Sequence, residues 1–115
     1  MDKTFQFKVW PVLLEACGEL DRATSKFPTW PTDPLHAVGV VAEEMGELQR
    51  EVLQLTYEPT KSTKESVRKE AIQLAAMSLR FLMSLDQYEY SPGPQHQQIM
   101  NPTGHIVFDD VEGAR

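Results

Sequence analysis

Oxygen-bearing side chains recur at helical spacing in two segments of the chain. Glu44 and Glu47 lie three residues apart in one segment, and Glu70 and Gln73 share that spacing in a second. Residues three apart fall on the same face of an α-helix, so each pair presents its oxygen atoms in one direction. Two such helices packed side by side could bring up to four of these side chains to one point. Carboxylate and carbonyl oxygens suit a hard divalent cation, and we expect Mg²⁺, with Mn²⁺ as a second possibility.

Glu70 is the most informative of these residues, because it lies on an apolar side of its segment. Val67, Leu74, Met77 and Phe81 project to roughly the same side. A carboxylate there is costly unless it is paired with a cation or bound to a metal. Spacing alone leaves two explanations open, a metal ligand or a salt bridge to Lys or Arg of another helix. The acidic run around Glu44, taken alone, would be an ordinary solvated helix face.

The first helix is predicted over Val9 to Arg22, where apolar residues recur at helical spacing. We expect it to begin near Lys8 or Val9, because Pro11 is tolerated in a first turn that needs no amide donor. Cys17, the single cysteine, is expected to be a buried thiol. Residues 26–34 contain three prolines and predict a connector.

The second and third helices carry the oxygen ligands. The second is predicted to begin at Pro34, capped by Asp33, and to end near Tyr57. Its apolar residues repeat with spacings of 3, 4, 3, 4 and 3. The sequence at 62–65 matches a capping box, and apolar residues follow as far as Leu85. Because only a few residues join these helices, an antiparallel hairpin is expected.

These elements predict an all-α fold, a hairpin-based bundle of three to four helices over residues 1–90. Residues 91–115 hold several Pro and Gly residues and predict an irregular tail, in which 105–108 could form a short strand. The third helix is apolar on nearly all sides, which indicates more than one buried face. We therefore expect oligomerisation to complete the bundle, as a homodimer or tetramer.

Composition excludes several classes of partner. The 115 residues include 17 acidic and 11 basic ones, a net charge of −6, which argues against binding a nucleic-acid backbone. No apolar run approaches the length of a membrane span, and the N-terminus lacks a signal-peptide core. With one cysteine, no disulfide can form within the chain. We expect a soluble, cytoplasmic protein.

At the acidic pairs the chain resembles the MazG-like, all-α nucleoside triphosphate pyrophosphohydrolases, which include the dimeric dUTPases and dCTP pyrophosphatases. The family pattern is Glu-Glu-x-x-Glu, a spacer, then Glu-x-x-Asp. Residues 43–47, Glu-Glu-Met-Gly-Glu, match the first half, and 70–73, Glu-Ala-Ile-Gln, match the second with Gln in place of Asp. The 22 residues between the halves fit the usual spacer. The resemblance covers roughly residues 34–86, the first helix only weakly and the tail not at all.

The resemblance implies a helical bundle that assembles into dimers or dimers of dimers and cleaves nucleoside triphosphates between the α and β phosphates. It implies magnesium bound by Glu44, Glu47, Glu70 and Gln73. Glu43 matches the remaining acidic position, which would bind a second ion or position the attacking water, and Glu44 is the other candidate to hold that water.

Substrate contacts require cations for the phosphates and an aromatic surface for the base. The phosphate candidates are Lys69 and Arg80, and Arg80 is the better placed because it lies seven residues beyond Gln73. Lys26, Trp30 and His36, in and beside the connector, are the candidates for the base. Trp30 could equally be a core residue beneath the connector.

Gln73 leaves two other functions open. It keeps a carbonyl oxygen for a metal but removes one negative charge, which should lower metal affinity. A catalytically impaired helical oligomer, acting as a nucleotide-binding or protein-interaction module, is therefore the alternative to an enzyme.

Overall fold

A computed structural model describes residues 1–90 of the chain, and the predicted tail at 91–115, with its possible strand, lies outside them. The described part is helical, as expected. Its three α-helices are α1 (Lys3–Lys26), α2 (Pro34–Tyr57) and α3 (Lys64–Met83). Two single-turn 3₁₀ helices, η1 (Pro59–Lys61) and η2 (Leu85–Gln87), follow α2 and α3.

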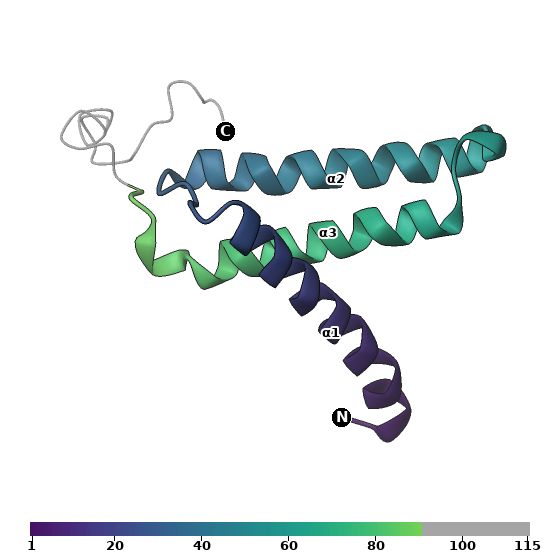
Figure 1. Cartoon of the computed structure of the whole chain (residues 1–115), viewed down its shortest axis with the longest axis horizontal. Helices are drawn as coiled ribbons and strands as arrows, with labels where there is room; N and C mark the ends of the chain where they lie inside the picture. The colour runs from purple at the N-terminus through teal and green to yellow at the C-terminus, as the bar shows by residue number, and fades with distance from the viewer. Residues whose placement is uncertain (91–115) are drawn as a thin grey trace, which may run out of the picture.

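Helices α2 and α3 form the expected antiparallel hairpin (Figure 1). Asp33 caps α2 by accepting a hydrogen bond from the Leu35 amide. The predicted capping box is displaced by one residue, because Thr63 is the N-cap of α3 and accepts from the Ser66 amide. Ser62 instead donates to Glu51 at 2.6 Å, which fixes the end of the hairpin link to α2.

Helix α1 is longer than predicted at both ends and contains Pro11 in its interior. Asp2 starts the helix by accepting a hydrogen bond from the Phe5 amide. Pro11 cannot donate to the Phe7 carbonyl, a loss that usually costs about 3 kcal/mol inside a helix. Phe7 is 82% exposed, so water can reach this turn of the helix.

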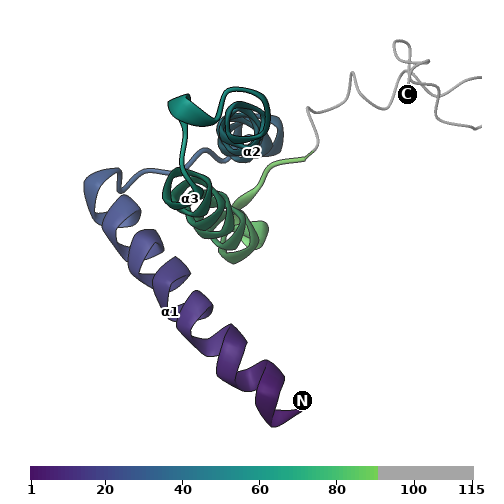
Figure 2. The ribbon, with the colours of Figure 1, turned by 90° about the vertical axis from the view of Figure 1, so that its right-hand side faces the viewer.

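Helix α1 packs across α3 on the side that faces away from α2, and its first half extends beyond the hairpin (Figure 2). Ala23 of α1 joins Ala76 and Met77 of α3 in a small buried cluster. The second apolar side of α3 is thus partly covered within the same chain. Cys17 is exposed rather than buried, because the neighbouring Ala16 occupies the packed face of α1.

Within residues 1–90, none of the helices combines the length and the apolar character needed to cross a membrane.

Candidate functional site

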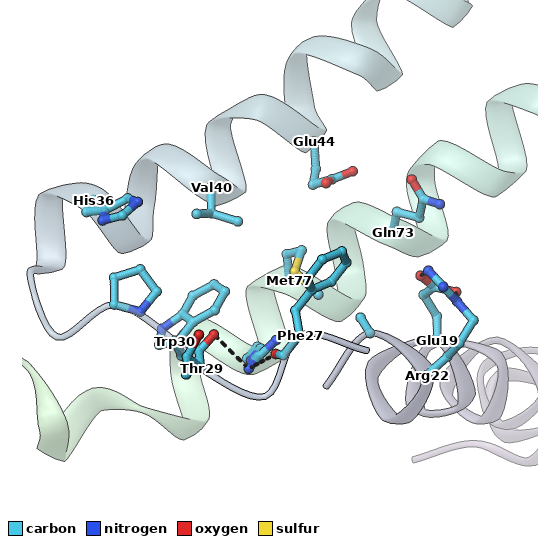
Figure 3. Close-up of a pocket in the computed structure, with 13 residues that line it drawn as sticks. Glu19, Arg22, Phe27, Thr29, Trp30, His36, Val40, Glu44, Gln73 and Met77 are labelled. Atoms are coloured by element: carbon cyan, nitrogen blue, oxygen red, sulfur yellow. Dashed lines mark hydrogen bonds and ion pairs between the residues drawn. The ribbon is translucent and has the colours of Figure 1, made fainter. Parts of the chain in front are cut away.

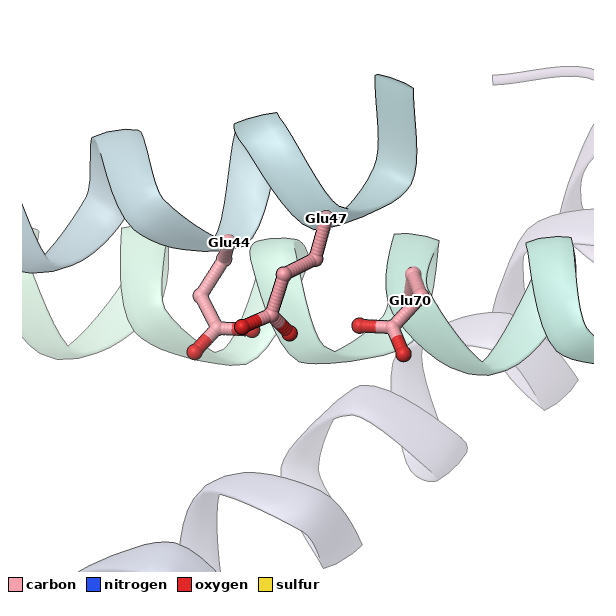
Figure 4. A group of neighbouring side chains, drawn as sticks. All are labelled: Glu44, Glu47 and Glu70. Atoms are coloured by element: carbon pink, nitrogen blue, oxygen red, sulfur yellow. The ribbon is translucent and has the colours of Figure 1, made fainter. Parts of the chain in front are cut away.

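Three carboxylates converge where α2 faces α3. Glu44 and Glu47 reach across from α2, and Glu70 reaches toward them from α3 (Figure 4). One oxygen from each side chain lies within 4.8 Å of the other two. The spacing of three residues on α2 and the antiparallel packing of α3 produce this arrangement, because they turn both carboxyl-bearing faces inward.

The cluster contains buried acceptor atoms without hydrogen-bond donors. Oε1 of Glu44 and Oε1 of Glu70 are inaccessible to solvent and accept no hydrogen bond. The ion pairs among residues 1–90 join Arg22 to Glu19, Lys61 to Glu58 and Arg68 to Glu15, and none reaches the cluster. The salt bridge considered for Glu70 is therefore not formed in the described part of the chain.

The electrostatic cost of this packing is visible in two carboxyl groups. Burial raises the pKa of Glu44, and the negative charges of Glu47 and Glu70 raise it further. Burial also raises the pKa of Glu70, and so does the close approach of the Glu47 carboxylate. Lys69 acts on Glu70 in the opposite direction. Both carboxyl groups are therefore harder to ionise than a free glutamate side chain.

This donor set fits a divalent cation. Buried, unpartnered carboxylate oxygens are the groups that a hard ion would satisfy, and three carboxylates supply the compensating charge. Gln73 lies one turn beyond Glu70 on α3 and faces the Glu44 side of the same space (Figure 3). Glu43 is exposed on α2 and is not among the three carboxylates whose oxygens converge.

A cavity of about 610 Å³ adjoins the cluster between the three helices and the connector. Glu44 and Gln73 line it together with Trp30 and His36 (Figure 3). Its remaining surface is largely apolar and includes Phe27, Val40 and Met77. A cavity of this size and character is typical of small-molecule sites.

Trp30 and Arg80 build the connector side of the cavity. The Arg80 guanidinium lies 4.9 Å from the centre of the Trp30 ring and donates hydrogen bonds to the Phe27 and Thr29 carbonyls. Trp30 in turn donates from its ring nitrogen to the Tyr88 hydroxyl at 2.9 Å. Both residues also line the cavity, so Trp30 is at once a packing residue and part of the wall.

The two lysines predicted to contact substrate lie outside this cavity. Lys26 ends α1, and its ammonium lies over the Phe27 ring at 5.5 Å. Lys69 lines a second cavity of about 700 Å³ between α1 and α3. Gln73 lines both cavities, which makes the two spaces neighbours.

Sequence reasoning missed the contribution of α1 to this region. Glu19 and Arg22 also line both cavities. Their spacing of three residues was a visible sign of an intrahelical ion pair, but nothing in the local sequence indicated that α1 would carry the pair to the acidic cluster.

No family model, curated protein or solved structure matches the chain in comparisons with each of these. The relation to the MazG-like pyrophosphohydrolases therefore remains a prediction from the motif at residues 43–47 and 70–73.

Proposed function

We propose that this protein is a magnesium-dependent nucleoside triphosphate pyrophosphohydrolase of the MazG-like type, which converts an NTP or dNTP to the monophosphate and pyrophosphate. The observation that supports this most is the convergence of Glu44, Glu47 and Glu70, with two buried oxygens lacking donors, beside a cavity of nucleotide size. An acidic cluster alone would be common on a helical protein. The adjoining cavity provides space for a substrate beside the cluster.

The cavity offers separate surfaces for the two ends of a nucleotide. Trp30 and His36 lie at one end and can stack on or hydrogen-bond to a base. Glu44 and Gln73 lie further along the cavity, where the phosphates of such a ligand would pass. Without a bound cation, the ionised carboxylates would repel a triphosphate, because the side chains and the ligand are both negatively charged. One cation bound here would offset the negative charge of the carboxylates and of the triphosphate at the same time.

Glu44, Glu47, Glu70 and the Gln73 amide oxygen would hold the magnesium ion. When bound, Mg²⁺ supplies positive charge that offsets the charge developing on the phosphates. Glu44 lines the cavity, whereas Glu43 lies outside its wall, so Glu44 is the better placed to accept a hydrogen bond from the attacking water. Attack forms a bond from the water oxygen to the α-phosphorus and breaks the bond between that phosphorus and the oxygen that bridges to the β-phosphate, and the proton of the water passes to Glu44 and then to solvent. Pyrophosphate leaves with that oxygen.

One observation favours a second candidate function, a nucleotide-binding module without turnover. Gln73 stands where the family pattern has Asp, so the site holds three carboxylates rather than four. A weaker metal site could retain a nucleotide and fail to hydrolyse it. Release of pyrophosphate distinguishes the two functions, because a binding module is stabilised by nucleotide without forming product.

The protein is also proposed to act as a homodimer or tetramer. The described chain has no large side chain that is completely buried, which is a small core for three long helices. Apolar side chains on the first half of α1 are exposed, with Phe7 at 82% and Leu14 at 71%. This half of α1 extends away from the hairpin (Figures 1 and 2). A second copy is a natural cover for such a surface.

The test of function is a pyrophosphate-release screen over canonical and modified nucleoside triphosphates, with and without Mg²⁺. We expect release from at least one triphosphate, dependent on Mg²⁺. Glu70→Gln should reduce the rate roughly 100-fold or more, the usual scale for losing a group that stabilises the transition state. Glu58→Gln is the matched control, because Glu58 pairs with Lys61 outside both cavities. Equal rates in the two variants would contradict the assignment of Glu70.

A further inference from the structure

Glu19 and Arg22 form a closed ion pair in the region where the two cavities meet. The Arg22 side chain donates from Nε to Oε1 of Glu19 at 2.9 Å and from Nη2 to Oε2 at 2.5 Å. Both residues line both cavities, a property that they share with Gln73. The two-pronged pair is of the kind that guanidinium groups also make with phosphate.

Charged groups of both signs surround this pair. Glu19 lies close enough to the acidic cluster to contribute, after burial and nearer carboxylates, to raising the pKa of Glu44. The positive charge of Lys69 acts on both Glu19 and Glu70. Lys69 and Arg68 line the second cavity next to Arg22, and of these cations only Arg68 and Arg22 are in ion pairs within residues 1–90.

The cavity system thus runs from the end lined by Trp30, past Glu44, to an end where the cations Arg22, Arg68 and Lys69 lie among the carboxylates of Glu15, Glu19 and Glu65. Figure 3 shows Trp30 and His36 at one end and Arg22 at the other, with Glu44 between. A nucleoside triphosphate has the same order of parts: a base, an α-phosphate and two further phosphates. If the base occupies the end lined by Trp30, the terminal phosphates reach the region of Arg22 and Lys69.

We propose that Arg22 binds the two terminal phosphates, the part of the substrate that leaves as pyrophosphate, and that Glu19 holds Arg22 until these phosphates displace it. This inference rests on the proposed function. The Arg22 side chain is 56% exposed and has room to turn toward an incoming anion, whereas the Glu19 side chain is 18% exposed. Glu19 competes with phosphate for the same guanidinium. A ligand must therefore bind the guanidinium more strongly than Glu19 does, which favours a polyphosphate over a singly charged ligand.

The competition predicts opposite effects from the two halves of one ion pair. The probe is inorganic pyrophosphate, titrated calorimetrically into the full chain in excess Mg²⁺. Arg22→Gln should weaken binding about tenfold, the usual scale for a charge-assisted hydrogen bond. Glu19→Gln should strengthen binding severalfold, because Arg22 is no longer occupied. The double variant should bind as weakly as Arg22→Gln, because the gain requires the guanidinium.

Lys61→Gln and Glu58→Gln are the matched controls, since they break an exposed ion pair of the same spacing that lines neither cavity. Both should bind pyrophosphate like the wild type. Arg22→Lys keeps the charge without the two-pronged geometry and should fall between wild type and Arg22→Gln. A purely structural ion pair would predict weaker or equal binding in both single variants, and that result overturns the proposal.

Hydrolysis by the wild type is measured separately. If the variants bind pyrophosphate with the predicted order of affinities but no nucleotide is hydrolysed, the proposed function is refuted and a polyphosphate groove at Arg22 is supported. Hydrolysis with equal pyrophosphate affinity in all variants would support the proposed function and refute the role of Arg22.

Discussion

Removing one carboxylate from the acidic cluster should stabilise the metal-free protein. The three cluster oxygens lie within 4.8 Å of one another. Two unit charges at that distance repel by about 3.5 kcal/mol at an effective dielectric constant near 20 and by about 0.9 kcal/mol in water. The three side chains are half-buried and can rotate apart or bind a proton, so the lower part of this interval applies. Glu70→Gln should therefore gain about 1 kcal/mol, or roughly 4–8 °C in Tm for a domain of this size.

The assay is thermal unfolding in EDTA and again in increasing Mg²⁺. In EDTA, Glu70→Gln should melt above the wild type. Added Mg²⁺ should raise the Tm of the wild type, by an amount equivalent to about 2.7 kcal/mol at a concentration 100-fold above Kd, and should leave Glu70→Gln nearly unchanged. The order of the two melting temperatures should therefore reverse as metal is added.

Glu65→Gln is the control on the same helix. It removes an equal charge from the first turn of α3, where the helix dipole favours an acid, so a small loss of stability is expected. The reasoning is refuted if Glu70→Gln melts below the wild type in EDTA, or if Mg²⁺ raises the Tm of the wild type and of Glu70→Gln by the same amount.

Four further predictions follow from the site and its surroundings. The pKa values of Glu44 and Glu70 are raised in the fold, so their contribution to stability is complete below the ordinary carboxyl pKa of 4.5 and is lost as the pH rises through the raised values. Unfolding in EDTA across pH 4–8 should show this loss of stability, and Glu70→Gln should make the loss smaller. Gln73→Asp should restore a fourth carboxylate, tighten Mg²⁺ binding in a calorimetric titration and retain any turnover; loss of the folded state instead would make Gln73 structural. Trp30→Phe removes the 2.9 Å hydrogen bond to the Tyr88 hydroxyl and should cost about 1 kcal/mol in chemical denaturation, and an unchanged midpoint would show that the bond is not needed. Phe7→Glu should shift the protein toward monomer in light scattering after size exclusion, since it places a charge on the exposed apolar part of α1; an unchanged mass would remove this surface from the interface.

Local sequence rules determined the hairpin and the direction of its acidic faces. Asp33 and Pro34 mark the start of α2, and Pro59 follows its end, because capping and proline chemistry act within a few residues. A spacing of three residues places Glu44 and Glu47 on one helix face regardless of what surrounds the helix. A short link then forces α3 to pack antiparallel, which brings Glu70 within reach.

Local rules were less reliable where a competing partner was available nearby. Pro11 was expected to fix the start of α1, but the Asp2 cap and the exposure of this turn allow the helix to begin earlier. Ser62 was expected to cap α3, but the Glu51 carboxylate accepts its hydroxyl proton and Thr63 takes the cap position.

Only the tertiary structure decided what α1 contributes. Helical periodicity identifies an apolar face but not the helix that will cover it, because the choice depends on packing between residues far apart in the chain. That packing places α1 on the far side of α3, brings Glu19 and Arg22 to the edge of the acidic cluster and leaves Cys17 exposed. It also determines that the Glu70 oxygen is buried without a partner, since burial is a property of the assembled helices and not of the residue.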